Sequence, residues 1–391
     1  MGSRQLMDKR GLSAFMEHVF VCIIVLLFMV ILAVLSLNLT IFSPFRQAFD
    51  DFSITDVYYA IQRTGNNVEW SDDIAIVDIT DQHSRSDIAR TLTQVAECKP
   101  KQVVIDLIFA APSEQPLADD SLVRAIDTIP NKVLAMKLTD YDPEQATFTS
   151  CVHSFFCPPD VSYNGFVNLP KSINSGVLRT FSTFETLSAD TVQAIAPLAW
   201  SKLGQTAFSL QPRERIIAFN NIQFPVVRYD SIAQLKGLLT GKIVIVGATH
   251  EEADMHITPI GKRPGTEIQA HIMQTCISHP HIKTTGTWFS ICLAALLCLL
   301  SAWIGRRIQK KFPLMYLYWL QGYYFLLSAL LVWIGFICYV KFDLYIKMTI
   351  PFVATALVEQ ARLHYKWIIS YGKAHPEKKW LSRLTQKSIY A

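Results

Sequence analysis

The chain has 391 residues, of which 51% are hydrophobic, and its 36 Lys and Arg exceed its 32 Asp and Glu by only four. The charge is unevenly placed, because residues 40–287 carry 20 Lys and Arg against 27 Asp and Glu, which leaves the basic excess in the flanking segments. Basic residues beside apolar segments are typical of the inner face of a membrane, where anionic lipid attracts them. This distribution therefore indicates lipid contact and excludes nucleic acid as a partner.

Four apolar segments predict transmembrane helices at residues 19–39, 288–304, 315–340 and 344–363. The first contains about 19 uncharged residues, which is the length needed to cross a hydrocarbon core of about 30 Å. No small-residue cleavage site follows it, so we read it as an anchor and not as a signal peptide. The fourth is interrupted by Lys347 and Pro351, so an interfacial segment or a buried soluble helix stays an alternative there.

Charge predicts the orientation of these helices. Basic residues gather in residues 1–18, 305–314 and 364–391, which lie on one side of an even number of crossings. Loops rich in Lys and Arg stay in the cytoplasm. The prediction is a multi-pass membrane protein with both termini in the cytoplasm and residues 40–287 outside it.

The outer block begins with the pattern of an α/β domain. Short β-branched runs at residues 74–79, 102–109 and 132–138 predict strands that are covered on both faces. Helical periodicity separates them at residues 85–98 and 119–127. This alternation predicts a mixed, largely parallel sheet flanked by helices.

The second half of the block is less regular. Four prolines and many polar residues predict a surface excursion over residues 140–191. We then expect a helix at residues 190–203, a hairpin around Asn220-Asn221 and a short helix at 231–239. A strand at 242–248 and a helix at 266–278 complete the block. That helix leads almost directly into the second apolar segment.

Two of the eight cysteines fall close together in the irregular stretch, at Cys151 and Cys157. In an oxidising compartment they are able to close a small disulfide loop. Two free thiols are the alternative, and the spacing is not that of a metal or redox CxxC motif.

Several motifs resemble those of CHASE2 domains, which are the extracellular sensory modules of bacterial membrane receptors. They are IAIVDIT (74–80), VVIDLIFAAPS (103–113), YNGFVNLP (163–170), GKIVIVGAT (241–249) and PGTEIQAH (264–271). The layout of one helix before the domain and three after it agrees with that family. The resemblance implies a bacterial inner-membrane protein with a periplasmic sensory domain.

The chain departs from the family pattern in two ways. Gln269 stands where the family commonly has a histidine. CHASE2 receptors usually continue into a cytoplasmic kinase, cyclase or phosphodiesterase, and only the basic segment 364–391 follows the fourth apolar segment. We therefore expect signalling or docking through a separate cytoplasmic effector. The alternative is a non-catalytic scaffold among the subunits of an envelope complex, and a homo-oligomer is left open.

Candidate ligand contacts follow the strands, because ligands of open α/β sheets bind at the carboxyl ends of parallel strands. These candidates are Asp78, Asp81, Asp106, Thr249, His250, Asp254 and Glu267. The alternative is that Asp78 and Asp106 only accept hydrogen bonds from nearby loops.

The segment HEEADMH also suggests His250, Asp254 and His256 as weak metal ligands, with a solvated loop as the preferred reading. It lacks the second histidine of HExxH. No phosphate-binding loop, nucleophile elbow or dinucleotide motif occurs in the sequence. We therefore expect no enzyme activity and no cofactor.

Overall fold

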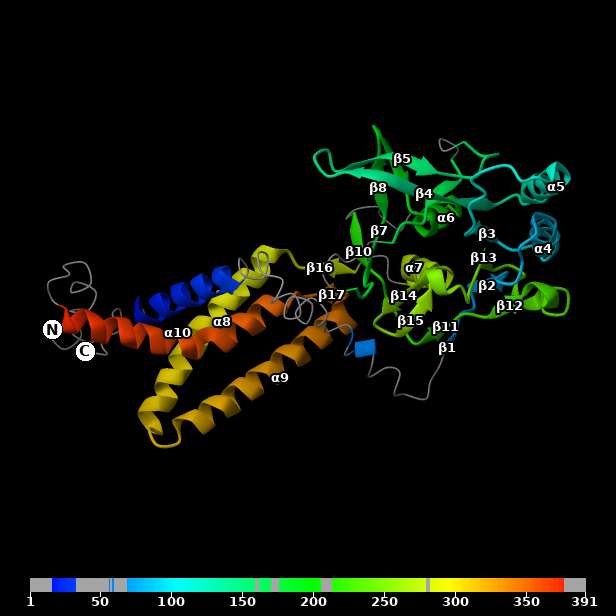
Figure 1. Cartoon of the computed structure of the whole chain (residues 1–391). Coiled ribbons are helices and arrows are strands. Elements are labelled where there is room, and N and C mark those ends of the chain that lie inside the picture. The colour runs from blue at the N-terminus through cyan, green and yellow to red at the C-terminus, as the bar shows by residue number, and fades with distance from the viewer. Residues whose placement is uncertain are drawn as a thin grey trace. The chain divides into compact units, whose positions relative to one another are not determined.

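The computed structural model describes residues 16–32, 56, 58–59, 69–158, 162–169, 176–204, 213–278 and 282–375. The chain divides into two compact units, one made of residues 1–54 and 284–391 and the other of residues 55–283. Figure 1 shows a helical unit and a unit built around a sheet, which we describe separately.

Among the described residues, a nine-stranded sheet forms the framework of residues 55–283. The strand order is β12-β2-β13-β3-β4-β5-β8-β9, and β6 pairs with β4 beside this path. All pairings of β2, β3, β12 and β13 are parallel. The prediction of a mixed, largely parallel sheet is thus confirmed. The bounds are β2 (Ile74–Asp78), β3 (Gln102–Ile105), β4 (Lys132–Asp142), β5 (Thr147–Val152), β6 (Asn164–Phe166), β8 (Phe184–Leu187), β9 (Asp190–Gln193), β12 (Val226–Arg228) and β13 (Ile243–Gly247).

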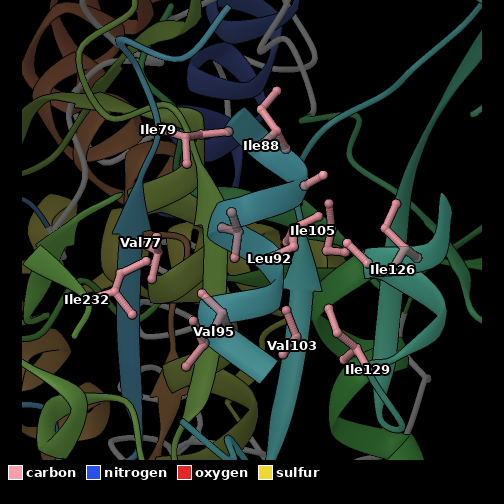
Figure 2. Close-up of a cluster of buried hydrophobic side chains, with 14 of the residues drawn as sticks. Val77, Ile79, Ile88, Leu92, Val95, Val103, Ile105, Ile126, Ile129 and Ile232 are labelled. Carbon is pink, nitrogen blue, oxygen red and sulfur yellow. The ribbon is translucent and has the colours of Figure 1, made fainter. Parts of the chain in front are cut away.

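Helices cover both faces of this sheet, so its central strands are buried and read as continuous apolar runs. Helices α4 (Arg85–Glu97) and α5 (Pro116–Asp127) pack on one face, where Leu92 of α4 joins Val77 and Val103 of the strands (Figure 2). Helices α6 (Ile195–Lys202) and α7 (Gly265–Ser278) contact the strands as well. Side chains alternate along a strand, so Ile76 and Val104 point away from the α4 side toward α6 and α7.

Strand β4 changes its partners along its length. Its first half pairs in parallel with β3 and β6, where Met136 lies opposite Phe166. Its second half pairs in antiparallel fashion with β5, beginning with Lys137 opposite Val152. One strand thus belongs to both the parallel and the antiparallel part of the sheet.

The prediction of a surface excursion over residues 140–191 is wrong. Strands β5, β8 and β9 extend the sheet there, and β7 (Thr180–Ser182) pairs with β10 (Glu214–Ile216). Tight reversals make this possible, since Ala146 and Ser188 adopt positive φ values of 52° and 54°. Pro143 lies in the turn between β4 and β5, and composition alone does not separate such a turn from a loop.

The predicted hairpin around Asn220-Asn221 is also wrong. Its two arms join different partners, because β10 pairs with β7 while β12 pairs in parallel with β2. Between them, β11 (Ile222–Gln223) pairs with β1 (Glu69–Trp70). Pro225 has no N–H to donate within a hairpin. Its carbonyl instead accepts a 2.8 Å hydrogen bond from the backbone N of Ile76, which ties the segment to β2.

Several predicted boundaries differ from the structure. Residues 190–193 form β9 and the helix α6 begins only at Ile195, while the strand predicted at 102–109 ends at Ile105. Residues 231–239 hold 3-10 turns in place of a helix: η2 (Tyr229–Ser231) ends there and η3 (Lys236–Leu238) follows. A further turn, η4 (Glu252–Asp254), leads into the hairpin of β14 (Met255–Thr258) and β15 (Gly261–Pro264).

The predicted disulfide between Cys151 and Cys157 is not formed in the structure, where both are free cysteines. Cys157 is buried in the cluster beneath α4 and α5, and its Sγ lies 3.2 Å from the Asn164 Oδ1. Cys151 packs in a separate apolar cluster with Phe148 and Leu187. The two cysteines therefore pack in two different apolar clusters.

The other unit is helical. Its described elements are a helix at Met16–Leu32, α8 (Thr287–Lys311), α9 (Tyr316–Phe342) and α10 (Thr349–Ala374), with the short strands β16 (Lys283–Thr284) and β17 (Leu344–Tyr345). Of the described helices, α8 and α9 are long and apolar enough to cross a membrane, where four such helices were predicted. Helix Met16–Leu32 is shorter, and residues 33–39 of that predicted span lie outside the described residues. Helix α10 carries several charged residues.

Small residues bring three of these helices together. Ala294 and Ala302 of α8, with Ala354 and Ala361 of α10, form an apolar cluster to which Val25 of the first helix contributes. Small side chains allow close packing between helices in lipid. The helix Met16–Leu32 is therefore an integral part of this bundle, although its described length is short for a span.

A charged group is buried within the same bundle. Arg362 of α10 is 2% exposed and donates hydrogen bonds to the hydroxyl of Tyr316 (2.7 Å) and to side-chain oxygens of Glu359 and Gln309 (both 2.9 Å). A Cβ added to Gly305 would lie 2.6 Å from the Arg362 guanidinium. Glycine at this position thus leaves the space that the guanidinium fills.

Candidate functional site

The carboxyl ends of three adjacent parallel strands bring the acidic candidates to one edge of the sheet. Asp78 ends β2 and lies in register with Gly247, the last residue of β13. Asp106 directly follows β3 on the other side of β13. Loops diverge at such an edge, which is why ligands of parallel sheets bind there.

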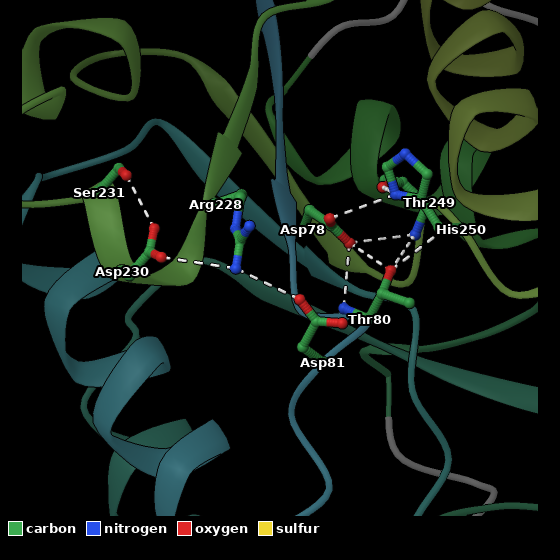
Figure 3. A network of polar contacts seen from close by, with 8 residues as sticks. All are labelled: Asp78, Thr80, Asp81, Arg228, Asp230, Ser231, Thr249 and His250. Atoms are coloured by element: carbon green, nitrogen blue, oxygen red, sulfur yellow. Dashed lines mark hydrogen bonds and ion pairs between the residues drawn. The ribbon is translucent and has the colours of Figure 1, made fainter.

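Asp78 joins the loops that follow β2 and β13 (Figure 3). Its Oδ1 accepts hydrogen bonds from the Thr80 backbone N (3.0 Å), the Thr80 hydroxyl (2.5 Å) and the Thr249 backbone N (3.2 Å). Burial on its own would raise the pKa of the Asp78 carboxyl, but these hydrogen bonds outweigh it and lower the pKa. Asp78 is therefore an ionised acceptor that holds the Thr249 loop in place.

His250, Asp81 and Arg228 form the exposed side of the same group (Figure 3). The His250 Nδ1 lies 3.5 Å from the Asp78 Oδ2, and the imidazole is 76% exposed. Arg228 lies 3.3 Å from Asp81 and 3.5 Å from Asp230, with all three side chains more than half exposed. Because these side chains are exposed, they form a polar surface beside the edge of the sheet. Exposed ion pairs of this kind contribute little to stability.

Asp106 forms a second acidic group with the start of α7. The Thr266 hydroxyl donates a 3.3 Å hydrogen bond to the Asp106 Oδ2, and the backbone N of Gly265 donates a 3.0 Å bond to Asp254. Burial, together with the charge of Asp254, raises the pKa of Asp106 to about 6 from its ordinary 3.8. A proton thus binds here in mildly acidic conditions.

Glycines permit this close approach. A Cβ at Gly247 would lie 2.5 Å from the Thr266 hydroxyl, and one at Gly265 would lie 2.4 Å from an Asp254 carboxylate oxygen. Contacts this short require the neighbouring groups to move. The glycines of the two motifs therefore allow the β13 end and the α7 start to meet Asp106 and Asp254.

These groups line a cavity of about 400 Å³, which we call the edge cavity. Its walls come from the ends of β3 and β6, from the middle of β4, from the segment after β13 and from the first turns of α7. Its polar lining residues are Asp106, Lys137, Asn168, Asp254, His256 and Gln269. The cavity thus combines carboxylates, an ammonium, an imidazole and two amides.

Gln269 stands out among them because of its environment. The residue is 4% exposed and lies one helical turn after Gly265 on the cavity side of α7. Its side-chain amide makes no hydrogen bond to any residue that the structure describes. By contrast, the Asn168 amide is held by the Leu138 backbone, with distances of 2.7 Å and 2.8 Å. The Gln269 amide therefore offers both a donor and an acceptor to an occupant of the cavity.

The structure does not bring the predicted site residues into one group. Asp106 and Asp254 line the edge cavity, whereas Asp78, Thr249 and His250 form the loop contact beside it. Glu267 belongs elsewhere, since its neighbours are Arg263 (3.5 Å) and His271 (3.9 Å) around another cavity.

The three metal candidates are also divided. His256 lies 3.5 Å from Asp254, while His250 lies beside Asp78. Within the described part of the chain, no three His, Cys, Asp or Glu side chains are grouped in a way that would hold a metal ion.

Sequence patterns did not point to Lys137, Asn168 or the contact role of Gln269. Lys137 lies where β4 changes partners, which depends on distant strands. The signal for Asn168 was its place in the YNGFVNLP motif. The signal for Gln269 was its departure from the family pattern, which a search for charged residues passes over.

The CHASE2 domain family matches the chain over residues 22–304. Neither a curated protein nor a solved structure matches it.

Proposed function

The chain belongs to the CHASE2 domain family, and on this premise we propose that it is a membrane-anchored sensory subunit whose α/β domain binds a small polar ligand in the edge cavity. Domains of this family are extracellular sensory modules, which makes ligand recognition the expected task of the outer block. The proposal assigns the chain no catalytic reaction and no cofactor.

The Gln269 amide is the observation that carries this proposal. A side-chain amide offers two N–H donors and a carbonyl acceptor, and within the cavity water or a ligand completes its bonding. Asp106 and Asp254 supply acceptors near it, and Lys137 supplies a cationic donor. This lining suits a ligand with an amine or several hydroxyl groups.

The membrane part of the proposal has four crossing helices in a bacterial inner membrane. The supporting features are the apolar lengths of α8 and α9, together with the packing of Met16–Leu32 and α10 against α8. The basic residues at 305–314 and 364–391 place these segments in the cytoplasm by the positive-inside rule. Residues 40–287 are then periplasmic.

A change at the edge cavity has a short path along the chain to the membrane. Helix α7 contributes Gly265 and Gln269 to the cavity and ends at Ser278, and α8 begins at Thr287. In this proposal ligand binding shifts α7, and a separate cytoplasmic protein reads the resulting change in α8. The buried Arg362 network links α8, α9 and α10, so the bundle is able to move as a unit.

Thermal unfolding of the full chain in lipid nanodiscs tests ligand binding. Putrescine serves as an amine probe and D-glucose as a polyol probe. A ligand that binds only the folded state raises the Tm by mass action. We expect at least one probe to raise it for the wild-type chain and not for Gln269→Leu. Exposed Gln234 provides the matched control. The proposal fails if neither probe acts, or if Gln269→Leu responds like Gln234→Leu.

Crosslinking in native membranes tests the partner. Recovery of a cytoplasmic kinase, cyclase or phosphodiesterase would support the sensory subunit. Recovery of envelope-complex subunits would instead support the scaffold, and recovery of the chain alone would contradict both.

A further inference from the structure

A second cavity of about 390 Å³ lies in the same domain, on another face of α7, and we call it the aromatic cavity. Glu267 and His271 of α7 line it, whereas Gly265 and Gln269 line the edge cavity. Residues two apart on a helix point in nearly opposite directions, which explains why one helix serves both. The remaining walls come from β1, from residues 219–226 and from β15.

Four aromatic rings form its apolar walls. They belong to Tyr59, Trp70, Phe219 and Phe224. The Tyr59 ring meets Phe219 edge-on with centroids 6.1 Å apart, while Trp70 is 62% exposed. Aromatic walls of this kind favour a ligand with a flat or bulky apolar body.

Opposite charges lie side by side in the same cavity. The Arg263 Nε is 3.5 Å from the Glu267 carboxylate, and these side chains are 32% and 26% exposed. They are therefore partly desolvated, which strengthens their interactions with a charged ligand. A ligand carrying both an ammonium and a carboxylate would match the pair without leaving a net charge in the cavity.

His271 adds a directional group. Its imidazole is 2% exposed and is packed by Phe219 and Phe224, with centroid distances of 5.1 Å and 4.9 Å. Burial first, and then the charge of Arg263, lower the pKa of His271 to about 3, so the ring is neutral. Its Nε2 lies 3.9 Å from a carboxylate oxygen of Glu267, which favours the proton on that nitrogen.

The other ring nitrogen of His271 has no partner. The Nδ1 is buried and forms no hydrogen bond with the described residues. A buried polar atom without a partner is uncommon and calls for an explanation. With the proton on Nε2, Nδ1 is the acceptor of the ring, but it is buried, so the imidazole contributes to the cavity as a packed, neutral wall.

We propose that the aromatic cavity is a second binding site, for a small zwitterion of the amino-acid class with an aromatic or large apolar side chain. The ammonium group lies toward Glu267, the carboxylate toward Arg263, and the apolar body against the aromatic walls. This site is independent of the edge cavity and of its ligand.

Isothermal titration calorimetry on the full chain in lipid nanodiscs tests this site, with L-phenylalanine as the probe. Phenethylamine lacks the carboxylate and 3-phenylpropanoate lacks the ammonium. We expect L-phenylalanine to bind and each analogue to bind at least about tenfold more weakly, as loss of one charge-assisted hydrogen bond implies. Lack of L-phenylalanine binding, or equal binding of all three compounds, would overturn the proposal.

Variants locate the binding in the cavity. Glu267→Gln and Arg263→Gln should each weaken L-phenylalanine binding about tenfold or more, for the same reason. Lys262 is exposed and precedes Arg263 outside the cavity lining, so Lys262→Gln is the matched control for loss of a positive charge. Circular dichroism checks that each variant is folded. Undiminished binding by the two folded cavity variants would place the ligand elsewhere.

Discussion

At the scale of residues, the edge of the sheet depends on glycines, which have no side chain, as much as on the polar side chains around them. Gly247 and Gly265 leave room for the Thr266 hydroxyl and the Asp254 carboxylate. The motif residues around them supply the acceptors and donors of the edge cavity. Burial first, and then the nearby charge of Asp254, raises the pKa of the Asp106 carboxyl.

Adding a methyl group at Gly247 should destabilise the domain. In Gly247→Ala the new Cβ would lie 2.5 Å from the Thr266 hydroxyl and 3.3 Å from the Asp106 Cβ. Overpacking of this kind costs about 1–3 kcal/mol. We expect a lower Tm in differential scanning fluorimetry. Gly237→Ala is the control, since a Cβ there has no atom within 4 Å. Equal Tm values for the two variants would contradict the packing at Gly247.

The pKa of Asp106 predicts a dependence of stability on pH. Because this pKa is raised from 3.8 to about 6, the folded state holds the proton more tightly than the unfolded chain does. The stabilisation is fully present below about pH 4 and is lost as the pH rises through about 6. A shift of this size corresponds to about 3 kcal/mol at most.

Thermal unfolding at pH 4.5 and 7.5 measures this effect. The Tm of the wild-type chain should fall more between these pH values than that of Asp106→Asn, which has no proton to lose at this position. Asp120 is exposed on α5, so Asp120→Asn should follow the wild type. A steep fall that persists in Asp106→Asn would assign the pH dependence to another group.

Strand ends made part of this site predictable from the sequence. Thr249 directly follows the run at 242–248, so its place at the edge follows from the pattern. Asp106 lay inside the strand predicted at 102–109, and it reaches the edge because β3 ends at Ile105. Glu267 was grouped with it because sequence order does not show which face of α7 a residue occupies. The Gln269 amide was not identified because its contact with the cavity depends on how α7 packs.

At the scale of elements, the local hydrophobic pattern predicts which strands are buried better than it predicts which strands pair with each other. The runs that became β2, β3 and β13 are buried throughout, and their β-branched residues indicated this directly. Strands β5, β8 and β9 are partly exposed and short. Strand β5 pairs with the preceding β4 and β9 with the preceding β8, whereas the β5–β8 pair joins Phe148 to the distant Leu187. Periodicity does not specify such pairings.

The helical bundle gives a prediction at this scale, centred on α10. Arg362→Met removes a buried guanidinium that is bonded to Tyr316, Glu359 and Gln309. Loss of one partner from a buried charged network costs about 3–5 kcal/mol, because the remaining groups stay desolvated. We expect a lower Tm and faster proteolysis of the nanodisc-embedded chain.

The same helix offers the control for this experiment. Lys373 is exposed near the end of α10, so Lys373→Met removes an equal charge without breaking a buried network. An Arg362→Met chain as stable as Lys373→Met would show that the network contributes nothing to the bundle.

At the scale of the whole molecule, family membership and charge distribution together lead to the proposed topology. The CHASE2 match extends from residue 22 to residue 304. It therefore includes most of the helix Met16–Leu32 and much of α8 together with the sheet domain. The match links the sensory domain to helices on both sides of it in the sequence.

Labelling of intact cells tests the topology. Asp120→Cys lies in the proposed periplasmic domain and Lys310→Cys in the proposed cytoplasmic loop. A membrane-impermeant maleimide should label the first in intact cells and the second only after lysis. The unsubstituted chain measures the background from its eight native cysteines. Labelling of both positions, or of Lys310→Cys alone, in intact cells would contradict the topology.

Strand β4 sets which side chains face each side of the sheet in both its parallel and its antiparallel part. Its last parallel pair, Met136 with Phe166, is followed at once by its first antiparallel pair, Lys137 with Val152. Successive side chains of a strand point to opposite faces, so one inserted residue reverses every side chain beyond it. An insertion between Met136 and Lys137 would therefore move the side chains of the antiparallel part of β4 to the opposite faces of the sheet, while those of the parallel part keep their faces. The length of β4 at this junction is therefore constrained, because the two parts of the sheet share a single alternation of side chains.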